Sequence, residues 1–354
     1  MKIEKELSKF KKRIDQYLER FLNGKLKEAR KISPLSEKII RSLKDFTLRS
    51  GKRLRAALIA YSYLACGGKD RKMIEELSIF IELIHNSLLI QDDIVDRDDL
   101  RRGKPTLHRE FEEWLGSGKT REREHFGNSL AIFGGNISCA LGYEIILKSE
   151  IPDLLKIKIL KIAEKMFEEV NFGEILDIYL SKAPRVKVAD VYKAYLYKSE
   201  KYTIEAPVII GATLAGASKK QAELLRRFAL PLGLAFQIKD DFLGIFGEEK
   251  VTGKAVGADI KEGKKTILIL ETLKRLGPSQ RVILEKALGN RNLNKKGIKM
   301  VRRLIKESGA LEAEGKLLNK LTFDAKGALG QGRWQGEGQL FLERIIDFII
   351  ERNY

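Results

Sequence analysis

Two segments that are apolar nearly all round, each running into a pair of aspartates, constrain the fold of this chain most strongly. The segments are Met73–Ile90, "MIEELSIFIELIHNSLLI", and Arg226–Ile238, "RRFALPLGLAFQI". A helix that is apolar on all sides belongs in the centre of a bundle rather than on its surface. The pairs that follow are Asp92–Asp93 and Asp240–Asp241. The sequence therefore predicts a bundle whose central helices carry carboxylates at their ends.

The rest of the sequence also favours helices. Leu, Lys, Glu, Arg, Ile and Ala dominate the 354 residues, and only 7 are proline. Windows such as "KIIRSLKDFTLRS" place apolar residues three and four positions apart, which is the period of an amphipathic helix. No series of alternating strands appears, and no proline- or serine-rich linker divides the chain. We therefore predict one all-α domain, a single large helical bundle spanning residues 1–354, in which the glycine-rich segment Ala325–Gln339 has no clear assignment.

Bulk properties narrow the function classes. The net charge is +18, but the lysines and arginines are mixed with glutamates along nearly the whole chain. Mixed charge of this kind is typical of solvated helix faces, so we expect no nucleic-acid partner. Two cysteines, Cys66 and Cys139, are too few for a framework of disulfides and fit buried thiols in a reducing compartment. The N-terminus lacks the apolar core of a signal peptide, and the apolar stretch Ala206–Ala217 is too short to cross a bilayer. We expect a cytoplasmic protein with at most peripheral membrane contact.

The first aspartate cluster indicates a metal and a phosphate. Asp92 and Asp96 are four residues apart and share a helix face. Carboxylates this close repel one another, and a bound cation relieves the repulsion. Mg²⁺ suits such oxygen ligands and usually also binds water and a substrate phosphate, while Arg101 and Arg102 suit phosphate oxygens. The stretch predicts a magnesium–diphosphate site; the alternative is a solvated acidic helix end followed by a basic turn.

A second carboxylate site and several basic groups support this interpretation. Asp240 and Asp241 end the other apolar segment, with Gln237 one helical turn earlier. Two such pairs on central helices can hold several Mg²⁺ ions on one diphosphate. Basic residues gather in three further places, and for each of them plain surface charge is the alternative. They are Lys52, Arg53 and Arg55; Lys198 and Lys201; and Lys254, Lys264 and Lys265.

Six motifs in order give a family resemblance. They are "GKRLR", "DDIVD" with "RRGKPT", "HFGNSLAIFGG", "YKSEKYT", "FQIKDDFLGIFG" and "GKAVGADIKEGKKT". With these motifs the chain resembles the trans-isoprenyl diphosphate synthases, also called polyprenyl synthetases. The resemblance implies a helical bundle with a central cavity, usually as a homodimer. It implies head-to-tail addition of isopentenyl diphosphate to an allylic diphosphate, with about three Mg²⁺ ions in each active site.

The resemblance also implies roles for single residues. Asp92, Asp96 and Asp240 are then the Mg²⁺ ligands, with Asp93 beside them. The allylic diphosphate and its pocket are implied to involve Arg101, Lys198, Ser199, Gln237, Lys254 and Lys264. The isopentenyl diphosphate site is implied to involve Gly51, Lys52, Arg53, His85 and Arg102. The catalytic set is Asp92, Asp93, Asp96, Arg101, Lys198, Asp240 and Lys254.

The chain departs from the family pattern at a few positions. Gly244 stands where many members carry a third aspartate of the second motif, which leaves Asp240 as the direct ligand there. Ser199 replaces a common threonine and keeps its hydroxyl, and Glu174 stands where glutamine is common. None of these changes removes a group on which the chemistry of the family depends.

Residues one turn before Asp92 are implied to set the product length. Ser87 leaves room where shorter-chain enzymes often carry an aromatic residue, Leu88 narrows the space, and Ile84 lies deeper. We expect geranylgeranyl diphosphate as the main product, with a longer chain or farnesyl diphosphate as alternatives. The alternative from a different class of function is a non-catalytic partner subunit of a prenyl synthase. A terpene cyclase is a weaker alternative, because it would not need the basic motifs.

Overall fold

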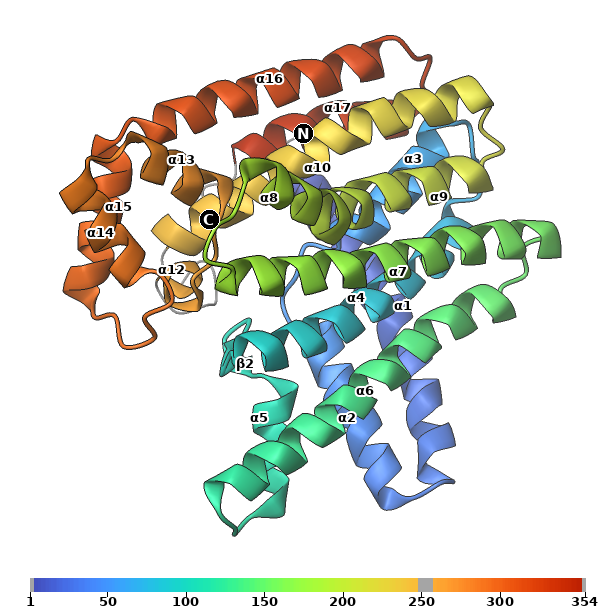
Figure 1. The fold of residues 1–354 in the computed structure, drawn as a ribbon. Helices are drawn as coiled ribbons and strands as arrows, with labels where there is room; N and C mark the ends of the chain where they lie inside the picture. Colours follow the sequence, from blue (N-terminus) through green and yellow to red (C-terminus); the bar gives the residue numbers. More distant parts are fainter. Residues whose placement is uncertain (1–2, 248–256, 352–354) are drawn as a thin grey trace. The chain divides into compact units, whose positions relative to one another are not determined.

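The described part of the computed structural model, residues 3–247 and 257–351, consists almost entirely of α-helices (Figure 1). Within it the strands are β1 (Leu100–Arg101) and β2 (Lys104–Pro105), which form one short antiparallel hairpin. The predicted all-α fold class is confirmed. Lys254, one of the predicted site residues, lies outside the described residues.

The chain divides into two compact units. The N-terminal unit comprises Met1–Ala60 with Gly68–Leu160, and the C-terminal unit comprises Tyr61–Gly67 with Lys161–Tyr354. Helices α3 (Leu54–Ala65) and α7 (Asp153–Lys182) contribute residues to both units. The single domain expected from the sequence therefore stays a prediction.

Helix α4 (Arg71–Asp96) is the centre of the N-terminal unit. It contains the first apolar segment, and most of its apolar residues are buried, as the sequence predicts for a central helix. Helix α6 (Thr120–Lys148) packs along it. The other elements of this unit are α1 (Ile3–Arg30), α2 (Pro34–Leu48), α5 (Leu107–Glu112) and the 3₁₀ turn η1 (Glu113–Leu115). Helices α1 and α2 pack on each other and on α4, and α5 packs on α6.

Glycines let α6 approach α4 closely. A Cβ atom at Gly142 would lie 2.8 Å from Ile84 Cγ1 and 2.9 Å from the carbonyl oxygen of Phe80. Carbon atoms in contact are normally about 3.5–4.0 Å apart, so a side chain at this position would push the helices apart. The glycines in and after "HFGNSLAIFGG" thus fix the helix spacing beside the apolar part of α4.

Helix α10 (Lys219–Phe246) is the centre of the C-terminal unit and contains the second apolar segment. It packs against α16 and α17, which run beside it in Figure 1, and against the π-helical segment η2. The other elements are η2 (Leu196–Glu205), α8 (Val188–Tyr195), α9 (Ala206–Leu214), α12 (Ala258–Glu262), α13 (Ile267–Arg275), α14 (Pro278–Ala287), α15 (Lys295–Glu307), α16 (Ala310–Gly330) and α17 (Gly336–Ile350). Both apolar segments are therefore central, each in its own unit.

Helix α6 is the one helix of the described residues with the length and composition to cross a membrane. Core helices of soluble proteins share these properties, and 44% of the most apolar part of α6 is buried inside the structure. The packing of α6 along α4 and α5 accounts for the buried part of this apolar surface, whereas Ile132, Phe133 and Ile137 are exposed.

The glycine-rich segment Ala325–Gln339 comprises the end of α16, the turn that follows it and the start of α17. The indole Nε1 of Trp334 donates to the carbonyl oxygen of Leu329 at 2.7 Å and so caps the end of α16. The backbone N–H of Gln335 donates to the carbonyl of Ala65 at 2.9 Å, and the ring of Phe341 stacks on Tyr61 with centroids 4.0 Å apart. The glycines allow α17 to lie directly on the end of α3.

We expect Gly338→Ala to destabilise the protein. The new Cβ would lie 2.2 Å from the backbone nitrogen of Ala65, and overpacking of this kind costs about 1–3 kcal/mol. Gly327→Ala in α16 is the matched control, because no atom lies within 4 Å of its Cβ position. That control should be neutral or gain about 0.5–1 kcal/mol from helix propensity. Thermal and urea unfolding of both variants measures the difference; equal stabilities would contradict this account of the turn.

Candidate diphosphate and metal sites

The last turns of α4 separate the roles of neighbouring aspartates. Asp93 is buried, whereas Asp92 and Asp96 are partly exposed on the face that they share. Burial raises the pKa of the Asp93 carboxyl to about 7, against the opposing effect of the Arg101 guanidinium. The helix ends at Arg97, whose φ of 59° is left-handed, and the N–H of Asp98 closes the turn on the carbonyl of Asp93 at 2.9 Å.

A tight hairpin follows these aspartates, and its first strand carries Arg101. Arg102 and Gly103 occupy its two turn positions with φ of 55° and 75°, which is the pattern of a type I′ turn. The Arg101 guanidinium donates from Nη2 to Asp92 Oδ2 at 3.0 Å and from Nε to Asp93 Oδ1. The reversal of charge along the sequence therefore becomes an ion-pair network in the structure.

The carboxylates of α4 fit a hard cation. Asp93 Oδ2 is buried without a hydrogen-bond partner among the described residues. Within the same part of the chain, no group of three His, Cys, Asp or Glu side chains is placed to hold a metal ion by itself. This is compatible with Mg²⁺, which usually keeps several waters and binds through one or two carboxylates together with substrate phosphates.

A second group of cations lies beside α4 in the same unit. Arg55 Nη1 lies 3.2 Å from His85 Nε2. Burial, followed by the charge of Arg55 and then Arg102, lowers the pKa of His85 well below its usual value. Burial and the nearby Arg53 also lower the pKa of Arg102, to about 10. The imidazole is therefore neutral at pH 7 and still able to donate one N–H, beside arginines that keep their charge.

The guanidinium of Arg102 is the clearest sign of an anion site. Its Nη1 is buried and has no hydrogen-bond partner in the described parts of the chain. Gly51 makes room for it, because a Cβ there would lie 3.0 Å from both Arg102 Cζ and Nη2. An unpaired buried N–H of a cation is costly, and a phosphate oxygen is an effective partner for it.

Arg53 and Lys52 lie differently from Arg55. Arg53 is 3% exposed and its guanidinium contacts Asp15 and Glu82, while Lys52 is exposed. The contact of Arg53 with isopentenyl diphosphate, predicted from the sequence, stays a prediction. Arg55, noted only as a nearby basic residue, is the one that lies beside His85. Spacing in the sequence could not show which of the two arginines lies beside His85, because the direction of the Arg53 side chain depends on its left-handed backbone conformation.

In the C-terminal unit, Lys198 is held by two carboxylates. Its Nζ lies 2.8 Å from Glu174 Oε2 and 2.8 Å from Asp177 Oδ2. Ser199, the next residue of η2, is buried. The departure at Glu174 thus gives Lys198 a charged partner where an amide is common. The predicted role of Lys198 in diphosphate binding is untested, but its position is fixed by these two pairs.

The aspartates of α10 repeat the division seen in α4. Asp240 is exposed and Asp241 is buried. The hydroxyl of Tyr195 donates to Asp241 Oδ2, and Gln237 Nε2 donates to its Oδ1 at 2.7 Å. Burial, followed by the charge of Asp259, raises the pKa of Asp241 well above its usual value. Asp241 is therefore a structural residue that also binds the side chain of Gln237, and Asp240 is the accessible carboxylate.

The structure explains the glycine in the second motif. A Cβ at Gly244 would lie 1.8 Å from Asp259 Oδ2, so the Asp259 carboxylate occupies the space that a third aspartate would need. Lys264 lies on the same group, 2.8 Å from Glu262 Oε2 and 3.9 Å from Asp259 Oδ1. Lys265 instead donates to the carbonyl of Ala183 at the end of α7.

The residues implied in product length are all buried in α4. Ser87 is 0% exposed, and its Oγ has no hydrogen-bond partner within the described residues. It lies beside Gly135 of α6, where a Cβ atom would be 3.7 Å from that oxygen. Ile84 lies against Gly142 one turn earlier, and Leu88 is also buried. Small residues on α6 therefore face the side chains expected to limit the product.

Comparisons with known proteins point to one family. A family model for polyprenyl synthetases matches residues 36–305. The short chain isoprenyl diphosphate synthase of Methanocaldococcus jannaschii is 34% identical over 77% of each chain, and the geranylgeranyl diphosphate synthase of Sulfolobus acidocaldarius is 32% identical over 73% of each. The geranylgeranyl pyrophosphate synthase of Corynebacterium glutamicum, solved with isoprenyl diphosphate and magnesium, has a TM-score of 0.93 at 28% identity. That match covers 98% of this chain and 99% of the other.

The chain belongs to the polyprenyl synthetase family. It is an enzyme of the trans-prenyltransferase class, which confirms the class predicted from the sequence. The helical fold is likewise confirmed.

We expect Gly244→Asp, which restores the commoner motif, to destabilise the protein. The new side chain and the Asp259 carboxylate would overlap and repel, at a cost of about 1–3 kcal/mol. Combining it with Asp259→Gly should recover most of the loss, because the two carboxylates would then no longer compete for one volume. Thermal unfolding tests this, with Gly24→Asp as a control at a position without neighbours. A stable single variant would contradict the explanation.

Proposed function

We propose that this enzyme adds isopentenyl diphosphate to an allylic diphosphate and makes geranylgeranyl diphosphate as its main product. The observation that carries the proposal is the Arg102 guanidinium near Arg55 and neutral His85: its Nη1 is buried and has no hydrogen-bond partner among the described residues. This cluster has the charge and donors to bind a diphosphate without a metal. The names of the relatives support the product, since several are geranylgeranyl diphosphate synthases.

The chemistry is a transfer of an allylic group to a carbon–carbon double bond. The allylic C–O bond breaks and its electron pair leaves with the diphosphate. The double bond of isopentenyl diphosphate then forms the new C–C bond, and a proton is lost to the departing diphosphate. When bound, Mg²⁺ neutralises the leaving group, and we propose about three ions in each site. Asp92, Asp96 and Asp240 are the proposed ligands.

The residues of the chain have separate proposed roles in this reaction. Arg101 bridges Asp92 and Asp93, so it holds the acidic cluster in place and can donate to a diphosphate on it. His85 donates one N–H to the diphosphate of the second substrate, and its neutral state avoids further repulsion among the arginines. Because the surroundings of His85 and the arginines beside it are largely shielded from water, the electrostatic attraction between them and a diphosphate is stronger than it would be in water.

The first experiment is a product analysis with purified protein. Isopentenyl diphosphate is incubated with each allylic diphosphate, with Mg²⁺ or with excess chelator, and the dephosphorylated products are chromatographed. A Mg²⁺-dependent product of geranylgeranyl length supports the whole proposal. A farnesyl or longer product supports the reaction and contradicts only the proposed product length. The absence of product with any primer would overturn the proposal in favour of a non-catalytic partner subunit.

Ser87→Phe should shorten the main product. The larger side chain would project from α4 beside Gly135, where the family resemblance places the limit of the growing chain. Ser87→Ala is the control, because it keeps the small volume and should leave the product unchanged. Thermal unfolding shows whether the Phe variant is folded. An unchanged product distribution from a folded Phe variant would refute the assignment of this region.

We propose further that the enzyme is a homodimer. Helix α6 exposes Ile132, Phe133 and Ile137, which are large apolar side chains on one helix. A second copy of the chain is the proposed occupant, in line with the family resemblance, and we propose the cytoplasm as its location. Apolar surfaces of this kind mark protein interfaces.

Phe133→Glu should convert the dimer to a monomer, because the charge would have to be buried at the interface. Light scattering after size-exclusion chromatography measures the mass directly. Phe323→Glu is the control, since Phe323 of α16 is also an exposed phenylalanine, at 78%, and it should leave the mass unchanged. A Phe133→Glu variant with the mass of the wild type would exclude α6 from the interface.

A further inference from the structure

We propose that Arg53 is a positioning residue, which together with Asp15 and Glu82 fixes the turn that presents Lys52 and Arg55. Helix α1 would then set the affinity for isopentenyl diphosphate without contacting it. The inference rests on the proposed function, because it concerns the cation cluster that we assign to that substrate. Arg53 thereby receives a role that differs from the direct contact implied by the sequence.

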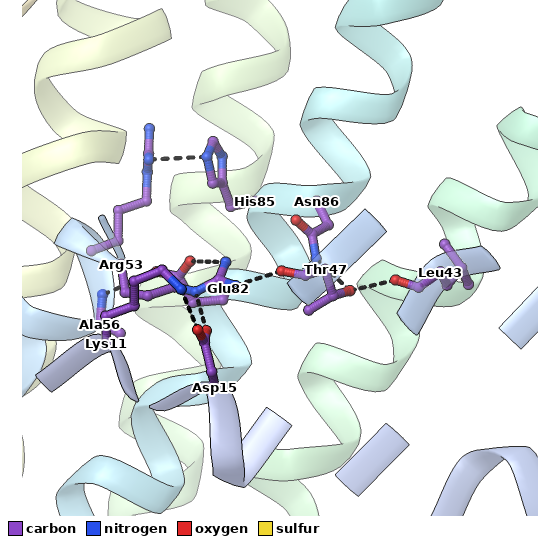
Figure 2. Close-up of polar contacts among 10 residues, drawn as sticks. Lys11, Asp15, Leu43, Thr47, Arg53, Ala56, Glu82, His85 and Asn86 are labelled. Carbon is purple, nitrogen blue, oxygen red and sulfur yellow. Dashed lines mark hydrogen bonds and ion pairs between the residues drawn. The ribbon is translucent and has the colours of Figure 1, made fainter. Parts of the chain in front are cut away.

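The side chain of Arg53 joins three helices of the N-terminal unit. Figure 2 shows its guanidinium between Asp15 of α1 and Glu82 of α4. Its Nε donates to Asp15 Oδ1 at 2.8 Å, its Nη1 to Glu82 Oε2 at 3.3 Å, and its Nη2 to the carbonyl of Thr47 in α2. The side chains of Arg53 and Glu82 are 1% and 4% exposed. This is a buried network, which solvent screens much less than a surface ion pair.

The backbone of Arg53 takes a conformation that needs such support. Its φ of 53° is left-handed, and a residue other than glycine keeps this conformation only where its surroundings fix it. Its carbonyl accepts the hydrogen bond of Ala57 N–H at 2.9 Å in the first turn of α3. Glu82 Oε1 accepts from the N–H of Ala56 at 3.4 Å. Glu82 therefore holds both the guanidinium of Arg53 and the start of the helix that follows.

The same turn decides where Arg55 points. Arg55 lies in the first turn of α3, and its Nη1 reaches His85, which follows Glu82 by three residues on α4. Asn86 continues the connection, because its Nδ2 donates to Thr47 Oγ1 at 2.8 Å. A shift of the Arg53 turn would therefore move Arg55 relative to His85 and Arg102.

Direct contact with a substrate is the competing role for Arg53. A diphosphate that bound this guanidinium would have to replace Asp15, Glu82 or both. The two roles predict opposite effects when the carboxylates are neutralised. Removing competitors would leave binding unchanged or strengthen it, whereas removing a support would weaken it.

The experiment uses Glu82→Gln and Asp15→Asn in the full-length enzyme. Binding of isopentenyl diphosphate alone is measured by calorimetry, and KM is measured for each substrate together with kcat. We expect the Kd and KM for isopentenyl diphosphate to rise roughly tenfold, as small misplacement of binding groups can produce. The KM for the allylic substrate should not change. Asp15 is partly exposed, so Asp15→Asn keeps the test open if Glu82→Gln does not fold.

Glu75→Gln is the matched control. It removes the pair in which Arg13 donates to Glu75 at 2.7 and 2.8 Å. That pair also joins α1 to α4, but it lies seven residues, or two helical turns, before Glu82. The control should lower thermal stability and leave both KM values unchanged. An equal rise of KM in the control would mean that general packing of α1, rather than Arg53, is responsible.

Two outcomes overturn the inference. Unchanged or tighter binding in both test variants would assign Arg53 to direct contact or to stability alone. A wild-type enzyme that forms no product and binds no isopentenyl diphosphate would instead overturn the proposed function. Arg55→Gln serves as the positive control, because loss of a direct donor should weaken binding whichever role Arg53 has.

Discussion

The positive charge buried beside α4 is the constraint on which the site depends. Arg53, Arg55 and Arg102 lie close enough to influence one another, and their charges add to the larger effect of burial in lowering the pKa of His85. Arg53 has carboxylate partners, whereas Arg102 keeps a buried N–H without a partner among the described residues. Desolvated like charges can be tolerated only where a counter-charge arrives. A diphosphate, the ligand that we propose for this cluster, is such a counter-charge.

The two aspartate pairs share one arrangement, with a buried carboxylate next to an accessible one. Adjacent residues on a helix point about 100° apart, so one carboxylate of each pair faces the interior and the other faces outward. Donors hold the inner ones: Arg101 binds Asp93, while Tyr195 and Gln237 bind Asp241. Asp92 and Asp240 remain accessible on the outer side. The inner aspartates thereby fix the helix ends from which the outer ones act.

Periodicity in the sequence was sufficient to predict the helical class, the two central helices and the shared face of Asp92 and Asp96. It was not sufficient where the backbone leaves the helical or extended region. The left-handed φ of Arg53 and Arg102 decides which arginine meets His85 and how the hairpin returns, and neither is a residue type that favours that conformation. Residue spacing also could not show that Asp259 fills the space at Gly244, because that contact depends on how α12 packs on α10.

The contact between Gly244 and Asp259 also constrains how such a sequence can change. Two positions that share one volume cannot be exchanged independently: an aspartate is acceptable at 244 only after the residue at 259 has become smaller or has moved. The pair is therefore epistatic, and the order of substitutions matters along any evolutionary route between the two forms of the motif.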